Sequence, residues 1–239
     1  VKDRLSSLVK AGRTGAEIVL CGPQKSGMKR YARFLSDCGE VNRYSESGNI
    51  VVRHRIESDA KGPGIERNFA ASALNQTLDF QTCPGLFSYA ELDSGTRALL
   101  EEVAPNPGED ILNLGCGYGA VGCFLSSSAG TSVTMSDDDC LATSYASANL
   151  ERNGLSGRAV VSDALQAIDA SFDLIVSNPP THAGDGVLQD MLTGAGKHLR
   201  EDGRIVLVHR KELGLSRHVS SSVSLRRETD GFKVVEVRS

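Results

Sequence analysis

Short apolar segments alternate with longer amphipathic segments through residues 75–239, the order typical of an α/β fold with a mostly parallel sheet. The apolar segments predict five strands, at residues 110–114, 131–135, 159–161, 172–176 and 204–208. The amphipathic segments predict three helices, at residues 119–128, 141–152 and 187–199. Two further strands, at 225–227 and 232–237, flank an Asp-Gly turn and predict an antiparallel pair that finishes the sheet.

The first 55 residues contain a pattern that returns near the end of the chain. Residues 16–27 (AEIVLCGPQKSG) resemble residues 203–214 (GRIVLVHRKELG), and each segment precedes a helix and a Gly-x-x-Val-Val strand. Such self-similarity indicates an internal duplication; the alternative is a chance likeness between two ordinary αβ units. The first copy lacks a glycine loop, so we predict a partial, degenerate segment at 1–55 with a structural or substrate-binding role. We expect a polar linker at 56–76 and a catalytic domain at 77–239.

The composition is that of a globular protein able to bury a core, with 40% hydrophobic and 23% charged residues. No apolar stretch is long enough for a membrane span, so we expect no membrane partner. The six cysteines form no Cys-x-x-Cys pair and the histidines have no metal-ligand spacing, so we expect no metal site. Free buried thiols are typical of a reducing compartment, and we expect the cytoplasm. The oligomeric state is not indicated.

The net charge of −4 is divided unevenly along the chain. Residues 1–60 carry 11 Lys and Arg against 7 Asp and Glu, residues 61–177 carry 5 against 15, and residues 178–239 carry 10 against 8. Basic segments on both sides of an acidic centre suit a protein whose ends contact a polyanion such as RNA. Solvated surfaces explain the same pattern more simply, so charge permits a nucleic-acid partner without identifying one.

The strand at 110–114 leads directly into a loop with alternating glycines, Gly115, Gly117 and Gly119. Glycines allow a tight turn and a close approach of the backbone to a ligand, and the next helix begins with unpaired N–H groups. Twenty residues after Gly117, Asp137 ends the second strand, where a carboxylate can accept hydrogen bonds from both hydroxyls of an adenosine ribose. These features together predict a nucleotide site, and a surface turn with an N-capping Asp is the lesser alternative.

The same glycine loop could also bind a nicotinamide dinucleotide. Polar residues after the next two strands favour a different ligand. Asp163 follows the third strand, where it can accept a hydrogen bond from an adenine amine. The fourth strand ends in Ser-Asn-Pro-Pro, residues 177–180. Ligands of open α/β sheets bind beyond the carboxyl ends of the strands, where all these residues lie.

The segments LNLGCGYG, SDDD and SNPP, in this order, resemble those of class I methyltransferases. Two longer segments, CPGLFSYAELDSGTRALL at 83–100 and SNPPTHAG at 177–184, resemble the small-subunit ribosomal RNA guanine-N2 methyltransferases and their short archaeal relatives. The resemblance covers residue 80 to the C-terminus. It implies a Rossmann-like sheet, RNA as substrate, and a preceding methyltransferase-like domain without a cofactor site, whose end residues 1–55 resemble.

The resemblance also implies that the cofactor is S-adenosylmethionine, with Phe87, Ser88, Gly95 and Thr96 at its methionine end. The expected cofactor-binding residues are Phe87, Asn113, Gly115, Cys116, Gly117, Gly119, Asp137, Asp138, Asp163, Ala164 and Asn178. Asn113 stands where the family commonly has an acid. We expect its amide to orient the glycine loop by accepting a hydrogen bond.

Asn178, Pro179 and Pro180 are the expected catalytic residues. An exocyclic aromatic amine is a poor nucleophile because its lone pair is delocalised into the ring. The side-chain carbonyl of Asn178 and the backbone carbonyl of Pro179 can bind the amine hydrogens and aim the lone pair at the methyl group. Pro180 stiffens the turn and removes a competing N–H donor. Outside this fold, Asn-Pro-Pro would as readily be an ordinary turn.

The residue after the second proline departs from the family pattern. Many amine methyltransferases place an aromatic ring there, which stacks on the target base, whereas this chain has Thr181. Stacking contributes roughly 1–3 kcal/mol per base, so the base face must be recognised by another ring, with Phe87, Tyr89 and His182 as candidates. Arg210, after the fifth strand, can equally bind a phosphate or remain solvated.

The sequence therefore predicts an enzyme that transfers a methyl group from S-adenosylmethionine to an exocyclic amine, most simply N2 of guanine in ribosomal RNA. Three alternatives stay open: a glutamine side chain of a protein, N6 of adenine, and a non-catalytic scaffold that binds cofactor or RNA. The segment at 83–96 favours the guanine acceptor, while Thr181 and the truncated N-terminal segment are the support for a scaffold.

Overall fold

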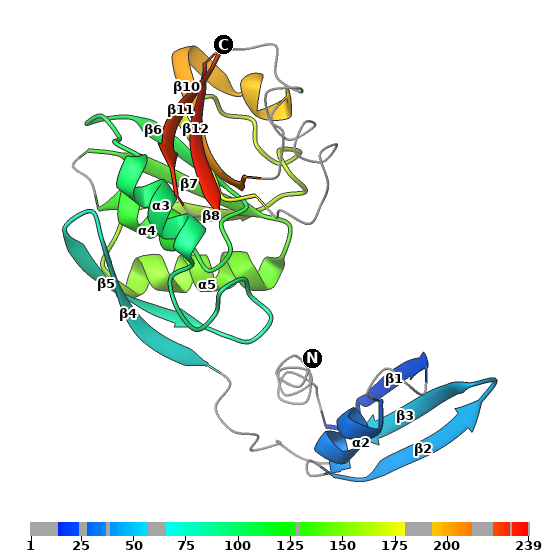
Figure 1. Cartoon of the computed structure of the whole chain (residues 1–239). Coiled ribbons are helices and arrows are strands. Elements are labelled where there is room, and N and C mark those ends of the chain that lie inside the picture. Colours follow the sequence, from blue (N-terminus) through cyan, green and yellow to red (C-terminus); the bar gives the residue numbers. More distant parts are fainter. Residues whose placement is uncertain are drawn as a thin grey trace. The chain divides into compact units, whose positions relative to one another are not determined.

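The computed structural model describes residues 14–23, 28–36, 39–56, 66–127, 130–179, 193–211, 222–229 and 231–238. The chain divides into two compact units, one with residues 1–67 and 83–85 and the other with residues 68–82 and 86–239 (Figure 1). Within the described ranges, every helix is too short or too polar to cross a membrane.

The larger unit contains a seven-stranded sheet in the order β11-β12-β10-β9-β6-β7-β8. Its strands are β6 (Asp110–Leu114), β7 (Ser132–Asp137), β8 (Arg158–Val161), β9 (Phe172–Ser177), β10 (Leu199–Arg210), β11 (Ser222–Glu228) and β12 (Phe232–Arg238). The strands from β8 to β10 are parallel, and β12 runs antiparallel to both β10 and β11. The predicted Rossmann-like sheet with an antiparallel final pair is confirmed.

Three helices pack against this sheet: α3 (Ser94–Glu102), α4 (Ala120–Ser126) and α5 (Cys140–Arg152). α4 and α5 correspond to the helices predicted at 119–128 and 141–152. Residues 187–192 of the third predicted helix lie outside the described residues. Its predicted end at residue 199 is wrong, because Leu199 already begins β10 and pairs with Phe172 of β9.

The central strands of the sheet are buried on both faces. Ile111 and Leu112 of β6 and Leu174 and Ile175 of β9 are fully buried. Consecutive apolar residues with no polar alternation are typical of parallel strands that are covered on both sides. This burial holds the carboxyl ends of β6 and β9 next to each other, with Leu114 paired to Ser177.

A hairpin of β4 (Arg67–Ala73) and β5 (Gln76–Thr82) forms a separate two-stranded sheet. Leu74 and Asn75 between the strands have φ of 50° and 59°, as a two-residue hairpin turn requires. The linker predicted at 56–76 therefore overlaps a strand. The polar composition of this segment suggests a linker because β4 exposes most of its side chains. The strand is nevertheless anchored, since the ring of Phe69 packs 5.8 Å from that of Phe80.

The smaller unit is an antiparallel three-stranded sheet, in the order β1-β3-β2, with one helix packed on it. Its elements are β1 (Glu17–Pro23), α2 (Met28–Ser36), β2 (Val41–Glu46) and β3 (Asn49–Arg55). The order is that of β10-β12-β11 in the larger unit. The register also agrees: Leu20 pairs with Val52, and the residues aligned with them in the repeated segments, Leu207 and Val235, pair with each other. Shared order and register support the interpretation of an internal duplication.

Candidate active site

The glycine loop joins β6 to α4 at the carboxyl edge of the large sheet. Gly117 and Gly119 have φ of 54° and 89°, a left-handed conformation that favours glycine. A Cβ on Gly119 would lie 2.9 Å from Ala146 of α5, so close packing also requires glycine there. At Gly115 and Gly117 a Cβ would meet no atom within 4 Å. The loop therefore packs on the protein at one glycine and faces open space at two, as a cradle for a ligand would.

Asp137, the last residue of β7, links this strand to the glycine loop through hydrogen bonds. Its carboxylate accepts hydrogen bonds from the N–H groups of Gly117 at 2.8 Å and Asp139 at 3.1 Å. Burial raises the pKa of Asp137, and the two hydrogen bonds offset part of that effect. A carboxylate has about four acceptor positions, so lone pairs remain for ribose hydroxyls. Asp138, beside it, is exposed.

Asp163 and Ala164 follow β8, and the adjoining Ser162 donates its N–H to the carbonyl of Asp137 at 2.9 Å. Asp163 is exposed and accepts a hydrogen bond from Gln166 Nε2 at 3.1 Å. Ala164 has a φ of 47°, which is uncommon for a residue with a Cβ. The backbone link brings Asp163 to the same edge of the sheet as Asp137, and its contact with an adenine stays a prediction.

Asn113 holds the glycine loop from within the sheet. The side chain is 1% exposed, its Oδ1 accepts the N–H of Gly122 at 3.1 Å, and its Nδ2 donates to the carbonyl of Val176 at 3.3 Å. The amide thus ties β6 to α4 and β9, which is the orienting contact expected of it. Because Asn113 is buried, its side chain positions the backbone at the start of α4, directly after the loop.

Asn149 of α5 and Asn153, the C-cap of that helix, hold β5, and Asn149 also holds the glycine loop. No local motif in the sequence indicates either residue. Asn149 is fully buried, accepts the N–H of Gln81 at 2.8 Å, and donates to the carbonyls of Gln81 and Tyr118, both at 2.9 Å. One turn later, Asn153 makes the same pair of hydrogen bonds with Asp79, at 2.9 and 2.8 Å. The two amides imitate a neighbouring strand for β5, and Asn149 fixes the backbone of the glycine loop.

The side chains of Cys116 and Tyr118 point into the protein. Cys116 is 7% exposed, and burial, together with the nearby charge of Asp137, raises the pKa of its thiol. Tyr118 packs edge-on against Phe80, with ring centroids 5.6 Å apart, and burial raises the pKa of its hydroxyl. Neither group ionises near neutral pH, so the loop offers its backbone and not an acid or a nucleophile.

Asn178 follows β9 and is held by the first turn of α3. Its Nδ2 donates to Thr96 Oγ1 at 2.9 Å and to Asp93 Oδ2 at 3.2 Å. A side-chain amide has two N–H donors, and both are used here. The carbonyl oxygen Oδ1 is therefore the group that Asn178 presents to a ligand.

Asp93 has a double function in this arrangement. It is the N-cap of α3, where Oδ2 accepts the N–H of Thr96 at 2.9 Å, and the same oxygen accepts the amide of Asn178. The sequence signals only the cap, since nothing in the local pattern connects positions 85 residues apart. Pro179 is buried, whereas the predictions for residues 180–182 fall outside the described residues.

Comparison with known proteins decides between the families that share this fold. The methyltransferase small domain family matches residues 77–236. Ribosomal RNA small subunit methyltransferase C of Haemophilus influenzae (strain PittGG) is 30% identical over 251 residues, which cover 100% of this chain and 76% of that protein. Its counterpart from Actinobacillus succinogenes is 31% identical, over 99% and 74% of the two chains. The chain belongs to the ribosomal RNA small subunit methyltransferase C family.

A solved structure of the methyltransferase C family has a similar architecture. The T. thermophilus 16S rRNA N2 G1207 methyltransferase (RsmC), in complex with AdoMet and guanosine, matches with a TM-score of 0.82 and 27% identity. The match covers 99% of this chain and 68% of that structure. It therefore includes the N-terminal residues, beyond the part of the chain where the sequence motifs show the resemblance.

The segment before α3 supplies the last part of this methyltransferase C site. Phe87 is 63% exposed. Ser88 donates its hydroxyl to the carbonyl of Glu91 at 2.8 Å, and the Tyr118 hydroxyl donates to the same carbonyl at 3.4 Å. The segment is thus tied to the glycine loop and has an exposed aromatic ring; its place at the methionine end of the cofactor stays a prediction.

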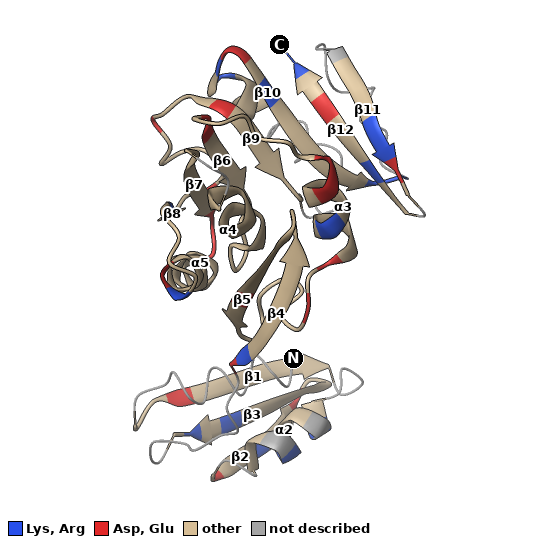
Figure 2. Ribbon diagram, turned by 90° about the vertical axis from the view of Figure 1, so that its left-hand side faces the viewer, with Lys and Arg blue, Asp and Glu red and all other residues tan. Residues whose placement is uncertain are grey.

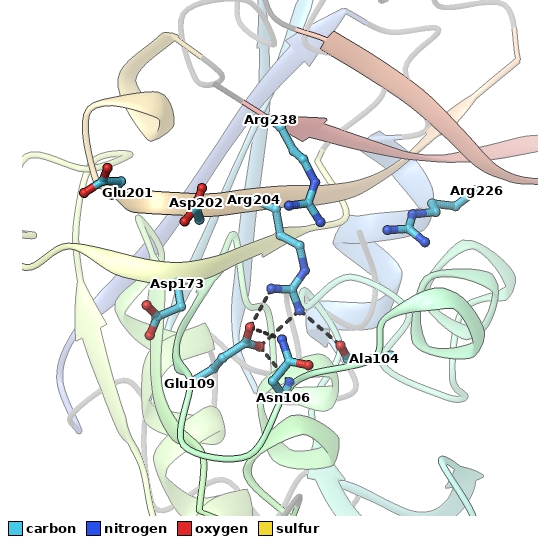
Figure 3. Close-up of a pocket in the computed structure, with 10 residues that line it drawn as sticks. Ala104, Asn106, Glu109, Asp173, Glu201, Asp202, Arg204, Arg226 and Arg238 are labelled. Atoms are coloured by element: carbon cyan, nitrogen blue, oxygen red, sulfur yellow. Dashed lines mark hydrogen bonds and ion pairs between the residues drawn. The ribbon is translucent and has the colours of Figure 1, made fainter.

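A pocket of about 490 Å³ lies at the opposite, amino edge of the methyltransferase sheet, where Arg204, Asp173 and Glu109 line it (Figure 3). Arg204 donates to both oxygens of Glu109 and to the carbonyl of Ala104. Burial alone would raise the pKa of Glu109, but hydrogen bonds from Arg204 and Asn106 outweigh it and lower the pKa. Arg204 and Glu109 of this pocket are thus paired with each other, and the residues that fit a nucleotide lie at the other edge.

Proposed function

We propose that this methyltransferase C family member transfers the methyl group of S-adenosylmethionine to N2 of guanine in small-subunit ribosomal RNA. Its family membership and the T. thermophilus relative, whose complex contains AdoMet and guanosine, support the proposal. The main structural support is the Asn178 amide, which donates its N–H groups to Asp93 and Thr96 at the start of α3. Such an amide presents only an acceptor, which suits a substrate amine with two hydrogens to donate.

The carboxyl edge of the sheet fits S-adenosylmethionine. Open space where side chains would stand at Gly115 and Gly117 allows the backbone to approach the cofactor. Asp137 has lone pairs for the ribose hydroxyls, and Asp163 is exposed where an adenine amine would need an acceptor. When bound, S-adenosylmethionine supplies an electrophilic methyl group on a sulfonium sulfur.

Asn178 and Pro179 orient the amine. Oδ1 of Asn178 and the carbonyl of Pro179 accept its two hydrogens, so that the nitrogen becomes pyramidal and its lone pair is directed away from the ring. Asp93 accepts a hydrogen bond from the Asn178 amide, which strengthens Oδ1 as an acceptor because linked hydrogen bonds polarise one another. In the balanced reaction the methyl group replaces one hydrogen of the amine, the sulfonium becomes a neutral thioether, and one proton is released. Positioning is thus the main contribution of these residues.

For residues 1–55 we propose the role of a degenerate methyltransferase-like segment that contributes structure or RNA contacts. The support is the β1-β3-β2 sheet, which repeats the last third of the catalytic unit without a glycine loop. We also propose that the enzyme acts in the cytoplasm, because ribosomal RNA must be accessible to it.

The test is transfer of labelled methyl groups to three acceptors offered in parallel: deproteinised small-subunit ribosomal RNA, assembled small subunits, and total protein. We expect label in RNA that is released by digestion as N2-methylguanosine. Label found only in protein would move the chain to the glutamine class, and label at N6 of adenine would contradict the choice of base. Cofactor binding without transfer to any acceptor would favour a scaffold.

A further inference from the structure

Arg210 ends β10 beyond the carboxyl end of the neighbouring strand. Leu207 of β10 pairs with Ser177, the last residue of β9. The residues after Leu207 therefore run past β9, beside the position of Asn178. At about 3.3 Å per residue, Arg210 lies about 10 Å beyond the last pair, at the same edge of the sheet as the candidate active site.

Arg210 and Asn178 lie on the same face of the sheet. Val206 of β10 pairs with Val176 of β9. Side chains alternate between the two faces along a strand, so Arg210, four residues after Val206, shares a face with Asn178, two residues after Val176. This is the face on which α3 packs, because Asn178 bonds the side chain of Thr96 in that helix.

Phe232 joins Arg210 to the same helix. It is the cross-strand partner of Arg210 in β12, and its ring lies 3.1 Å from the place where a Cβ on Gly95 would stand. The Cζ of Arg210 lies 5.9 Å from the centroid of the Phe232 ring, within the range of a cation–π contact. The ring supports the guanidinium next to the first turn of α3.

The charge of Arg210 differs from that of its neighbours. Basic residues recur along β11 and β12 (Figure 2), and most are paired with acids. In the described part of β10–β12 and at residue 211, a carboxylate lies within 4 Å of Arg200, Arg204, Lys211, Arg226, Arg227, Lys233 and Arg238. Among the described residues, no carboxylate forms an ion pair with Arg210. Within the described part of these strands, Arg210 is therefore the basic side chain best placed to meet an external anion.

We infer that Arg210 binds a backbone phosphate of the RNA next to the target guanine, an inference that rests on the proposed function. A base that leaves its stack to reach Asn178 brings the phosphates of its own nucleotide to the rim of the pocket. The guanidinium fork binds phosphate through two parallel hydrogen bonds. Arg210 is held at this rim by an aromatic ring, so little side-chain freedom is lost when the phosphate binds.

The test measures binding of the full chain to deproteinised small-subunit ribosomal RNA over a series of salt concentrations. Each phosphate contact contributes about −0.7 to −0.9 to the slope of log K against log salt. We expect Arg210→Ala to make the slope shallower by about that amount and Arg210→Lys to retain it. Arg152→Ala is the matched control, because Arg152 is an exposed cation at the end of α5, on the amino side of the sheet. Its slope should equal that of the wild type.

A slope for Arg210→Ala equal to that of the wild type would overturn the inference, as would an equal change in the Arg152→Ala control. Affinity for S-adenosylmethionine should be the same in all four proteins, and its loss in Arg210→Ala alone would assign Arg210 to the cofactor site instead. Failure of the proposed function looks different: the wild-type chain would transfer no methyl group to RNA, whatever the slopes.

Discussion

The three strands near the start of the chain and the three at its end share their order and register, but their surroundings differ. Val19 of β1 and Val206 of β10 occupy aligned positions in the two sheets. Val19 is 50% exposed, whereas Val206 is 3% exposed. In the larger unit α3 packs on β10 and β12, and β10 pairs with β9 at the edge of the parallel part of the sheet. One local pattern therefore serves once as the border of a catalytic sheet and once as a small sheet of its own.

An ion pair occupies the same two positions in both sheets with its charges exchanged. Glu17 and Arg53 lie 3.6 Å apart, with side chains 46% and 49% exposed. The aligned residues, Arg204 and Glu236, lie 3.9 Å apart, with side chains 11% and 5% exposed. Either polarity suits the register of the strands. Burial then decides how much each pair contributes to the stability of its sheet, because charges in water interact weakly and a buried charge without a partner is costly.

Substitution of the two aligned ion-pair residues should separate the sheets most clearly. Arg204→Ala leaves Glu109 and Glu236 with fewer partners in a buried position, and we expect a loss of about 3–5 kcal/mol in the free energy of unfolding. Glu17→Ala should cost about 0–1 kcal/mol. Urea unfolding measures the total loss in the free energy of unfolding of each variant. Hydrogen exchange of peptides from each sheet then shows which sheet is destabilised. Equal losses in the two variants would show that burial does not govern these pairs.

The aligned valines give a smaller contrast of the same kind. Val206→Ala removes two buried methyl groups and should lower the free energy of unfolding by about 1.6 kcal/mol, at about 0.8 kcal/mol per buried carbon. Val19→Ala should stay within about 0.5 kcal/mol of the wild type. The same unfolding measurement compares them. A cost at Val19 as large as that at Val206 would indicate that the outer face of β1 is covered in solution.

Acid should weaken the C-terminal sheet through Glu236. Burial alone would raise the pKa of Glu236, but hydrogen bonds from Arg238 and Arg226 outweigh burial and lower the pKa. A carboxyl with a lowered pKa stabilises the fold above its unfolded value, about 4.3, and this stabilisation is lost as the pH falls through the folded pKa. We expect the urea midpoint to decline below about pH 4.5, and to decline less in Glu236→Gln. An unchanged pH dependence in that variant would exclude Glu236 as the group responsible.

The parts of the fold that were predictable from sequence are those written in local patterns. The buried strands β6 and β9 each contain two or more consecutive apolar residues. The glycine loop follows β6, and Asp137 ends β7, twenty residues after Gly117. β4 escaped prediction because it exposes most of its side chains. Asn149 and Asp93 escaped because their contacts join residues 68 and 85 positions apart, which only the folded chain brings together.

The central claim is that the Asn178 carbonyl, fixed by α3, orients the acceptor amine. The most direct measurement compares the wild type with Asn178→Ala for two quantities, affinity for S-adenosylmethionine and the rate of methyl transfer to small-subunit ribosomal RNA. We predict a rate lower by about 100- to 1000-fold, the usual effect of removing one preorganised hydrogen-bonding group, with cofactor affinity retained. Transfer at the wild-type rate would contradict the account, and a parallel loss of cofactor affinity would assign Asn178 to cofactor binding instead.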